Sequence, residues 1–470
     1  MASLSIRSQG TDATFLGHPR GLAYLAFTEA WERFSFYGMQ SLLVLYMVQS
    51  LFVPGQIENV AGMAAYRSAI EAMLGPLSAQ ALAGQTFGFY AGLVYFTPLI
   101  GGWVADRWLG SKKTVVIGVV LMTAGHAAMV FDQSFLLALL LLILGSGALK
   151  GNIAAQVGQL YATQDARRTT AFAAFSMAIN IGAIFGPLAC GLLAQAYGWH
   201  YGFGVAGLLM LVALGVYLKG LRYFPEEPPV RRDRSQEAAL TMQEWRSIAA
   251  IMAMLSMMVV LGLGYDQMYN MGMAWIDQAV DLDTTLGRLP VAWFVSIDSV
   301  AIVAATAGVI ALWQWQANHG RSSSESTKIA IGGALTTIGV AIIAVGAAMA
   351  ESGKVSIAFP VLAFAFTGIG FAWYWATWLA LVSRYSPAKI AARMMAAAYL
   401  VAFFGNVISG YVATFYETMS PALFWSLNAG VCFAGSAAFY VFGPMLVRGL
   451  HSGAAEQPFA GQRVGPLKAL

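Results

Sequence analysis

Long apolar runs alternate with short polar segments along almost the whole chain of 470 residues. Twelve runs reach about 20 residues, the length that a helix needs to cross the hydrocarbon core of a bilayer. Helices are the expected form, because lipid offers no hydrogen-bond partner to an open backbone. The runs lie at residues 21–48, 82–105, 113–131, 134–158, 169–195, 200–222, 247–273, 291–315, 328–349, 355–383, 390–416 and 422–447.

The spans form two sets of six on either side of a polar segment. We therefore expect an all-α membrane protein with an N-terminal six-helix bundle at residues 1–223, a cytoplasmic linker at 224–245 and a C-terminal six-helix bundle at 246–470. Two such halves are typical of major facilitator transporters, in which they rock around a site near the midplane. A second long connection, at 50–81, could carry a surface helix over residues 57–74.

Composition removes several other classes of protein. Hydrophobic residues make up 59% of the chain and charged residues 10%, with a mean hydropathy of +0.66, whereas a soluble domain is about a quarter charged. Cys190 and Cys432 lie in apolar runs and indicate no disulfide framework. The histidines are scattered, and neither a nucleophile elbow nor a P-loop is visible, so we expect neither an enzyme nor ATP drive. The polar first 20 residues do not predict a cleavable signal peptide.

The loop charges predict the orientation of the chain in the membrane. Of the 26 lysines and arginines, Arg67, Arg288 and Lys354 fall in loops on one side, and Arg33 and Lys150 fall inside spans. All the others lie on the side that holds both termini. Positively charged loops face the cytoplasm, so we expect both termini to be cytoplasmic in a plasma (inner) membrane.

Ionisable side chains inside spans are costly and therefore suggest function. Glu29, Glu32 and Arg33 share one face of the first helix, because their spacing follows the helical repeat. Glu29 precedes Arg33 by four residues, the favourable orientation for an ion pair. A purely structural ion pair is one interpretation, but three ionisable groups on one face are more than such a lock requires.

The two halves differ in the charge of their spans. The N-terminal half carries two acids and two bases, whereas the C-terminal half carries Asp266, Asp298 and no base. A cavity between the halves could hold both ends of a zwitterion. A lone buried lysine tends to lose its proton, so Lys150 is expected either to pair with a helix 1 glutamate or to stay free for an anionic substrate group. Asp298 could instead be solvated near the outer mouth.

Several motifs resemble those of the proton-dependent oligopeptide transporter family of the major facilitator superfamily, and the resemblance covers almost the whole chain. The most specific motif lies at residues 29–38 and is similar to the family's E-x-x-E-R-F motif. Residues 101–113 are similar to the superfamily's cytoplasmic loop between helices 2 and 3. Residues 147–152 and 175–182 resemble family signatures in helices 4 and 5.

The resemblance implies roles in proton coupling for charged residues of both halves. Glu29 and Glu32 would carry protons. Arg33 and Lys150 would engage these acids and a peptide carboxylate. Asp266 stands where the family has an acid followed by glutamine, and it would be a gating or proton-linked group.

The resemblance also implies a pocket and a gate. Tyr37, Tyr95 and Asn180 would line the pocket, although an interhelical hydrogen bond is an equally good interpretation of Asn180. Asp106 and Arg107 would belong to an acid–base latch at the inward gate.

Departures from the family pattern fall mostly in the binding half of the site. Gln40 replaces a second arginine, Phe36 replaces a pocket tyrosine, and Phe371 stands where a helix 10 glutamate holds the amino terminus of the peptide. We hypothesise that Asp298 takes over this amine-holding role. Trp375, one of several crowded helix 10 aromatic residues, could make a cation–π contact with an amine or simply pack.

The function predicted from the sequence is proton-driven symport of di- or tripeptides, or of a peptide-like zwitterion, by alternating access. An alternative within the same fold is transport of a non-peptide substrate such as a modified amino acid, a small siderophore or a peptide-derived antibiotic, with export as one direction. A receptor that no longer transports is a further alternative. We expect no cofactor besides the proton gradient, no nucleic-acid partner and a monomer in the lipid bilayer.

Overall fold

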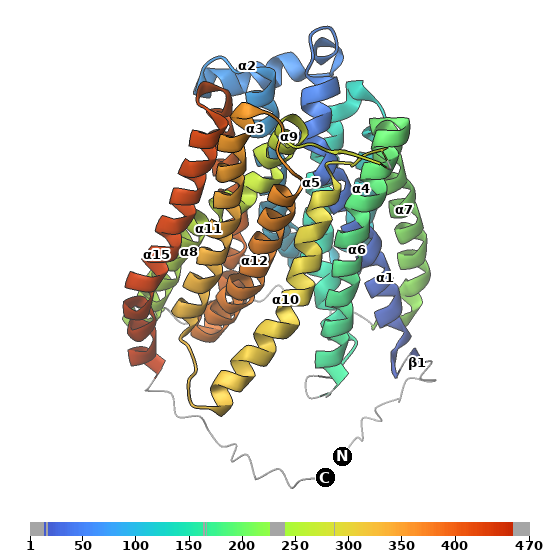
Figure 1. The fold of residues 1–470 in the computed structure, drawn as a ribbon. Helices are drawn as coiled ribbons and strands as arrows, with labels where there is room; N and C mark the ends of the chain where they lie inside the picture. The colour runs from blue at the N-terminus through green and yellow to red at the C-terminus, as the bar shows by residue number, and fades with distance from the viewer. Residues whose placement is uncertain are drawn as a thin grey trace, which may run out of the picture.

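The computed structural model describes residues 14–15, 17–162, 165, 167–225, 240–285 and 287–454. Most of the predicted linker at 224–245 therefore lies outside the described residues. Strands form two short antiparallel hairpins, β1 (Thr14–Phe15) with β2 (His18–Pro19) and β3 (Asp283–Thr284) with β4 (Gly287–Arg288). Apart from an isolated bridge between Val280 and Val355, the other regular elements of the described residues are helices (Figure 1).

The N-terminal half contains seven α-helices and several single turns of tighter or wider helix. The α-helices are α1 (Arg20–Tyr46), α2 (Met63–Leu74), α3 (Ala79–Val104), α4 (Ser111–Ala128), α5 (Phe135–Gln159), α6 (Arg167–Tyr197) and α7 (Trp199–Gly220). The single turns are η1 (Met47–Leu51), η2 (Ile57–Asn59), η3 (Ala105–Leu109), η4 (Asp132–Ser134) and η5 (Leu221–Tyr223).

The C-terminal half is built in the same way. Its α-helices are α8 (Met242–Tyr269), α9 (Met271–Ala279), α10 (Trp293–Asn318), α11 (Glu325–Met349), α12 (Ala358–Tyr385), α13 (Ala391–Ala398), α14 (Leu400–Ala413) and α15 (Pro421–Ala454). Its single turns are η6 (Ala350–Ser352), η7 (Ala388–Ile390) and η8 (Tyr416–Thr418).

Each of the twelve predicted spans coincides with one helix or with consecutive helices, so the predicted all-α fold is confirmed. Ten helical segments of the described chain are long and apolar enough to cross a membrane. The other two spans correspond to α1 and α4. The helix α1 carries Arg20, Glu29, Glu32 and Arg33, and α4 begins with Ser111, Lys112 and Lys113, so both helices are less apolar than the other ten.

Two predicted elements differ in detail from the structure. The seventh span was expected to be continuous over 247–273, but the helix breaks at Asn270 (φ −97°, ψ −99°). Asn270 Nδ2 donates a hydrogen bond of 3.0 Å to the Gly84 carbonyl of α3, so its side chain links the two halves at the break. The surface helix expected over 57–74 is confirmed only for α2, because Gly62 (φ 81°) separates α2 from the turn at η2.

Glycines bring helices into backbone contact around the charged spans. A Cβ on Gly182 of α6 would overlap the Ala30 carbonyl of α1, and one on Gly101 of α3 would overlap the Gly147 carbonyl of α5. Small residues at crossings are how helices approach one another closely in lipid. These crossings fix α1 against α6 and α3 against α5, and so position Arg33 and Lys150.

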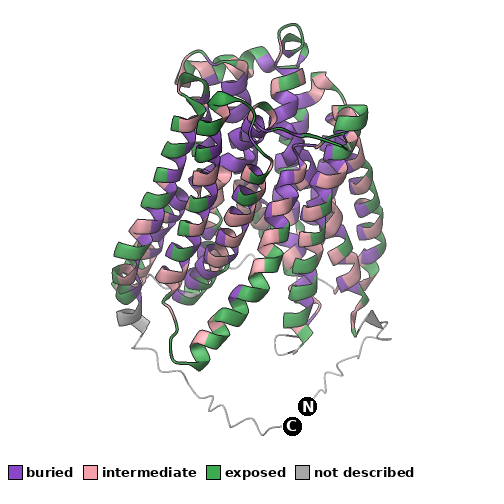
Figure 2. Ribbon diagram, viewed as in Figure 1, coloured by how far each residue is buried: buried purple, intermediate pink, exposed green. Residues whose placement is uncertain are grey.

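The two halves meet closely at the end of the bundle that carries α2. There, Trp293 Nε1 of α10 donates to the Leu188 carbonyl of α6 at 3.0 Å, and Ser296 Oγ donates to the Ile184 carbonyl at 2.7 Å. Toward the opposite end, where α1 begins and α15 ends, α10 leans away from the bundle (Figure 1), and its residues 300–318 are largely exposed (Figure 2). The helices α10 and α6, which are joined by hydrogen bonds at the α2 end, therefore separate toward the opposite end.

Candidate functional site

The charged residues of α1 form a compact buried group. Arg33 Nε lies 2.8 Å from Glu29 Oε1 and 2.8 Å from Glu32 Oε2, so two carboxylates share one guanidinium. The predicted pair of Glu29 with Arg33 is confirmed as geometry. Glu32 is fully buried, and neither of its oxygens accepts a hydrogen bond from the described residues. Its negative charge is thus held by Coulomb attraction alone, which is a poorly satisfied state for a buried carboxylate.

Lys150 of α5 forms no ion pair with these acids in the described part of the chain. Its Nζ is buried and has no hydrogen-bond partner in the described part of the chain. The ammonium instead lies 4.1 Å from the ring centre of Phe36 and 4.8 Å from that of Tyr95. The expected ion pair with a helix 1 glutamate is therefore not formed among the described residues, and a contact with an anionic substrate group stays a prediction.

The remaining pocket residues predicted on α1 and α3 surround this group. Phe36 and Gln40 are buried, while Tyr37 and Tyr95 are partly exposed. The Phe36 ring packs edge-on against Tyr37 with centroids 5.1 Å apart. Tyr37 is within electrostatic range of both Arg33 and Asp298, which belong to different halves. The predicted residues of the two halves therefore face one another across the interface.

Asp298 of α10 is buried and held by two tyrosine hydroxyls of α8. Tyr269 donates to Asp298 Oδ2 at 2.6 Å, and Tyr265 donates to the same oxygen at 2.9 Å. Only 1% of Asp298 is exposed, so the interpretation of a solvated residue near the mouth is wrong. The sequence analysis did not single out these two tyrosines. They are four residues apart and therefore share a helix face, and this spacing next to Asp266 was the available signal.

Asp266 of α8 faces α14 in the same half. Asn406 Nδ2 lies 3.3 Å from Asp266 Oδ1 and donates to it. A Cβ on Gly405 would overlap Asp266 Oδ2, so a larger residue there would require the carboxylate to shift. Asn406 and Gly405 were not singled out from the sequence, because nothing local marks an asparagine in an apolar run as the partner of an acid 140 residues away.

Aromatic rings occupy the place of the helix 10 glutamate. Phe371 stacks on Tyr265 at 5.2 Å and on Trp375 at 5.5 Å, with interplanar angles of 22° and 18°. Tyr265 also binds Asp298, so the carboxylate and the phenyl ring share one neighbour. Trp378, by contrast, is fully buried, and its Nε1 donates to the Ala398 carbonyl at 3.1 Å. Trp378 therefore has a packing role within the cluster of helix 10 aromatic residues.

Three predicted site residues have no hydrogen bond or ion pair to the charged group among the described residues. Asn180 is partly exposed, and its Nδ2 returns a hydrogen bond of 3.0 Å to the Ser176 carbonyl of its own helix. Asp106 and Arg107 are exposed in η3, at the end of the bundle where α10 leans away. Arg107 lies over the Trp103 ring at 5.9 Å, and no ion pair of either residue occurs within the described ranges.

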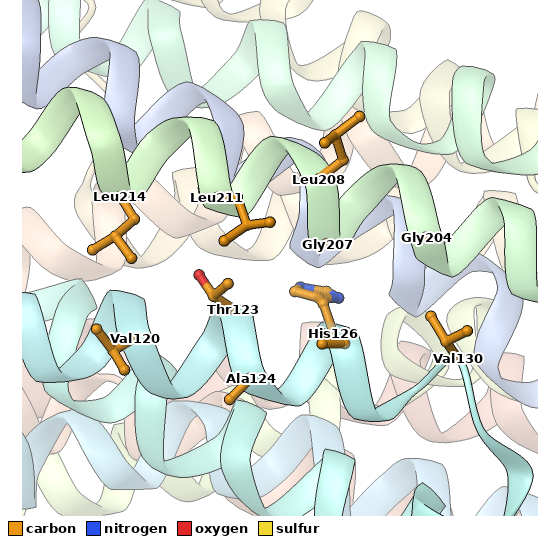
Figure 3. A pocket seen from close by; sticks show the side chains of 11 residues that line it. Val120, Thr123, Ala124, His126, Val130, Gly204, Gly207, Leu208, Leu211 and Leu214 are labelled. Carbon is orange, nitrogen blue, oxygen red and sulfur yellow. The ribbon is translucent and has the colours of Figure 1, made fainter.

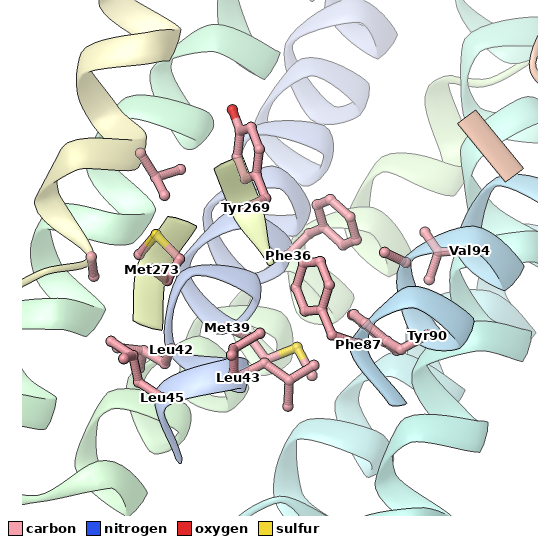
Figure 4. Close-up of a cluster of buried hydrophobic side chains, with 14 of the residues drawn as sticks. Phe36, Met39, Leu42, Leu43, Leu45, Phe87, Tyr90, Val94, Tyr269 and Met273 are labelled. Carbon is pink, nitrogen blue, oxygen red and sulfur yellow. The ribbon is translucent and has the colours of Figure 1, made fainter. Parts of the chain in front are cut away.

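Apolar and polar contacts between the halves close the group toward the α2 end. Apolar side chains of α1, α3 and α9 interleave there, among them Met39, Phe87 and Met273 (Figure 4). Farther out, Gln49 Nε2 donates to Asp277 Oδ2 at 2.6 Å. The charged group is thus covered toward the α2 end. Toward the opposite end it faces the region where α6 and α10 separate.

Two helical halves that meet around a buried charged group define a multi-pass membrane transporter with the major facilitator fold. A crystal structure of the peptide transporter POT in complex with sulfate has this fold, with a TM-score of 0.80 and 24% identity over 93% of this chain and 97% of that chain. The family model described as POT family matches residues 112–241 and 233–426. The chain belongs to the POT family.

Curated relatives agree with this assignment. The di-/tripeptide transporter of Lactococcus lactis subsp. cremoris is 43% identical over 220 residues, which are 46% of this chain and 41% of that protein. The match thus spans about two fifths of the length of this relative. The uncharacterized transporter YclF of Bacillus subtilis (strain 168) is 26% identical over 493 residues, covering 93% of this chain and 96% of the relative.

Proposed function

We propose that this protein is a proton-coupled symporter of di- or tripeptides that works by alternating access. The observation that carries the proposal is the division of charge across the interface between the halves. Arg33 and the unpaired Lys150 lie on the N-terminal side, and Asp298 and Asp266 lie on the C-terminal side without any base. A peptide with a carboxylate at one end and an ammonium at the other matches this division. Membership of the POT family supports the same conclusion.

The arrangement of α1 supports a place for the proton. Glu29 and Glu32 share one guanidinium, and Glu32 has no hydrogen bond of its own. Protonation of either acid frees part of the charge of Arg33 for a substrate carboxylate, which would couple the two ligands. No bound cofactor enters this cycle, because the proton gradient supplies the free energy.

The closed α2 end and the separated opposite end support one step of alternating access. With both termini in the cytoplasm of an inner membrane, as the loop charges predict, the state described here faces inward. Asp106 and Arg107 are exposed on this side, where they could latch the gate in the opposite state. We propose that the monomer carries out the whole cycle.

Uptake of labelled dialanine into proteoliposomes with an imposed inward proton gradient tests the proposal. We expect accumulation that a protonophore abolishes. Absence of accumulation by protein whose cooperative unfolding shows that it is folded would overturn peptide symport. A thermal-shift screen of other zwitterions and amines would then identify the substrate class.

Proton coupling has its own test. In the variants Glu29→Gln and Glu32→Gln, uphill uptake should be lost, while counterflow exchange of dialanine, which needs no net proton movement, should survive. Loss of both activities would instead assign these acids a structural role.

A further inference from the structure

A cavity of about 490 Å³ lies between α4 and α7, apart from the charged group of the transport site. Its volume is within the range of ligand pockets, roughly 300–1,000 Å³. Most of its lining is aliphatic, with Val120, Leu208 and Leu211 exposed at the rim (Figure 3). Because these residues lie in membrane-spanning helices, the cavity opens toward lipid.

One buried polar side chain in this cavity has no partner. His126 is 1% exposed, and neither of its ring nitrogens has a hydrogen-bond partner among the described residues. Figure 3 shows its imidazole in the space between α4 and α7, near Gly207. The other polar group, the Thr123 hydroxyl, already donates to the Val119 carbonyl at 2.8 Å. An unpaired buried polar group costs free energy, so His126 indicates that a hydrogen-bonding ligand occupies the cavity.

The depth of the polar group identifies the class of ligand. His126 lies two residues before α4 ends at Ala128, which is roughly 3 Å along the helix axis. Val120 lies six residues toward the bilayer centre, roughly 9 Å deeper. The unpaired polar group of the cavity therefore lies near the end of the span, and mostly aliphatic side chains lie below it. This matches the order of groups in a membrane lipid, with ester groups above hydrocarbon.

We propose that this groove binds one acyl chain of a glycerophospholipid and that the His126 imidazole donates its N–H to an ester carbonyl of that lipid. The site lies outside the proposed transport machinery and does not depend on the transported substrate. A second cavity, of about 360 Å³ between α11 and α12, is lined by aliphatic residues and Phe359 alone. It offers no anchor for an ester and therefore serves as the internal comparison.

The test uses a phosphatidylethanolamine with a photoreactive acyl chain in proteoliposomes containing the full-length protein. Crosslinked peptides should map to α4 and α7. Unlabelled ester-linked lipid should compete roughly threefold to tenfold better than its ether-linked analogue, which lacks the carbonyl acceptor. In His126→Phe, which keeps a ring of similar size, this difference between ester and ether lipid should disappear.

Two further variants keep the test decisive if His126→Phe does not fold. A Cβ at Gly204 would meet no atom within 4 Å, so Gly204→Leu has room to fill the groove and should reduce labelling of α4 and α7. Ala341→Leu, in the comparison cavity, should leave the ester preference unchanged. Equal competition by ester and ether lipid in the wild type, or crosslinks that avoid α4 and α7, would overturn the proposal.

Discussion

The two halves of the transport site hold their carboxylates in different ways. In the N-terminal half, Glu29 and Glu32 share one cation, Arg33, at 2.8 Å. In the C-terminal half, Asp298 is held by the neutral hydroxyls of Tyr265 and Tyr269. A carboxylate with neutral donors can accept a cation without losing an existing ion pair. Under the proposed function, the C-terminal acids would receive the substrate amine, whereas the N-terminal acids would give up part of Arg33 to a substrate or a proton.

A second contrast lies within the N-terminal half. Arg33 and Lys150 are both buried cations near the interface, but the first is paired twice and the second lies only against the rings of Phe36 and Tyr95. Removal of a paired charge leaves its partners uncompensated, whereas Lys150 has no close ion pair that its removal would break. Substitution of Arg33 should therefore lower both stability and transport, whereas substitution of Lys150 should lower transport alone.

The largest effect is expected for Arg33→Leu. Both carboxylates of α1 would lose their counterion, which costs about 3–5 kcal/mol for a buried pair. We expect a large fall in melting temperature together with complete loss of peptide uptake. Glu29→Gln is the matched control, because it leaves Arg33 paired with Glu32 and should lower the melting temperature much less. An unchanged melting temperature in Arg33→Leu would contradict the view of Arg33 as the shared counterion.

Lys150→Met should break transport without breaking the fold. The variant breaks no ion pair, so its melting temperature should equal or exceed that of the wild type. Loss of a charge-assisted contact to the substrate carboxylate should lower dialanine uptake roughly tenfold to a hundredfold. The measurement is uptake alongside unfolding of the same preparation. A marked destabilisation would instead indicate that Lys150 supports the carboxylates of α1 electrostatically.

The sequence predicted those features that depend on local spacing. The spans follow from the lengths of the apolar runs, and the Glu29–Arg33 pair follows from a separation of four residues on one helix. Features that depend on tertiary contacts were not predictable. The position of Lys150 over Phe36 and Tyr95 joins three helices. The break at Asn270 was not predictable from the sequence, because one asparagine hardly changes the mean hydropathy of its apolar run.

The neutral environment of Asp298 was also beyond the sequence. The hypothesis that Asp298 replaces the missing glutamate rested on its charge alone, and it remains a prediction. The structure adds a physical link, because Tyr265 binds the Asp298 carboxylate and stacks on Phe371. The Tyr265 ring therefore separates Asp298 from Phe371, which stands where the family pattern has a glutamate.

Asp298→Asn should weaken recognition of the substrate amine. Asparagine retains an oxygen that can accept from the tyrosine hydroxyls, so the fold should persist while the negative charge disappears. We expect uptake of dialanine to fall roughly tenfold to a hundredfold, the value of a hydrogen bond to a charged group. Competition by N-acetyl-dialanine, which has no amine, should not change. In Tyr265→Phe, which keeps the charge and removes one donor, uptake should fall less. Unchanged uptake in Asp298→Asn would show that Asp298 does not bind the substrate amine.

The smallest effect is expected for the exposed counterpart of the α1 pair, on α2. Arg67 Nε lies 2.8 Å from Glu71 Oε1, the same spacing of four residues and the same distance as Arg33 with Glu29, but at the protein surface. Surface pairs of this kind contribute little. The hydrogen bond from Arg67, followed by that from the Leu77 backbone, lowers the pKa of Glu71 below its ordinary value of 4.5.

The sign of the pH dependence follows from that shift. A carboxylate with a lowered pKa in the folded protein contributes stability above its unfolded pKa, and this stability is lost as the pH falls through the folded pKa. Glu71→Gln should therefore lower the melting temperature slightly at pH 7, and the difference from wild type should vanish as the pH falls below 4.5. A decrease at pH 7 as large as that of Arg33→Leu would show that burial does not distinguish the two pairs.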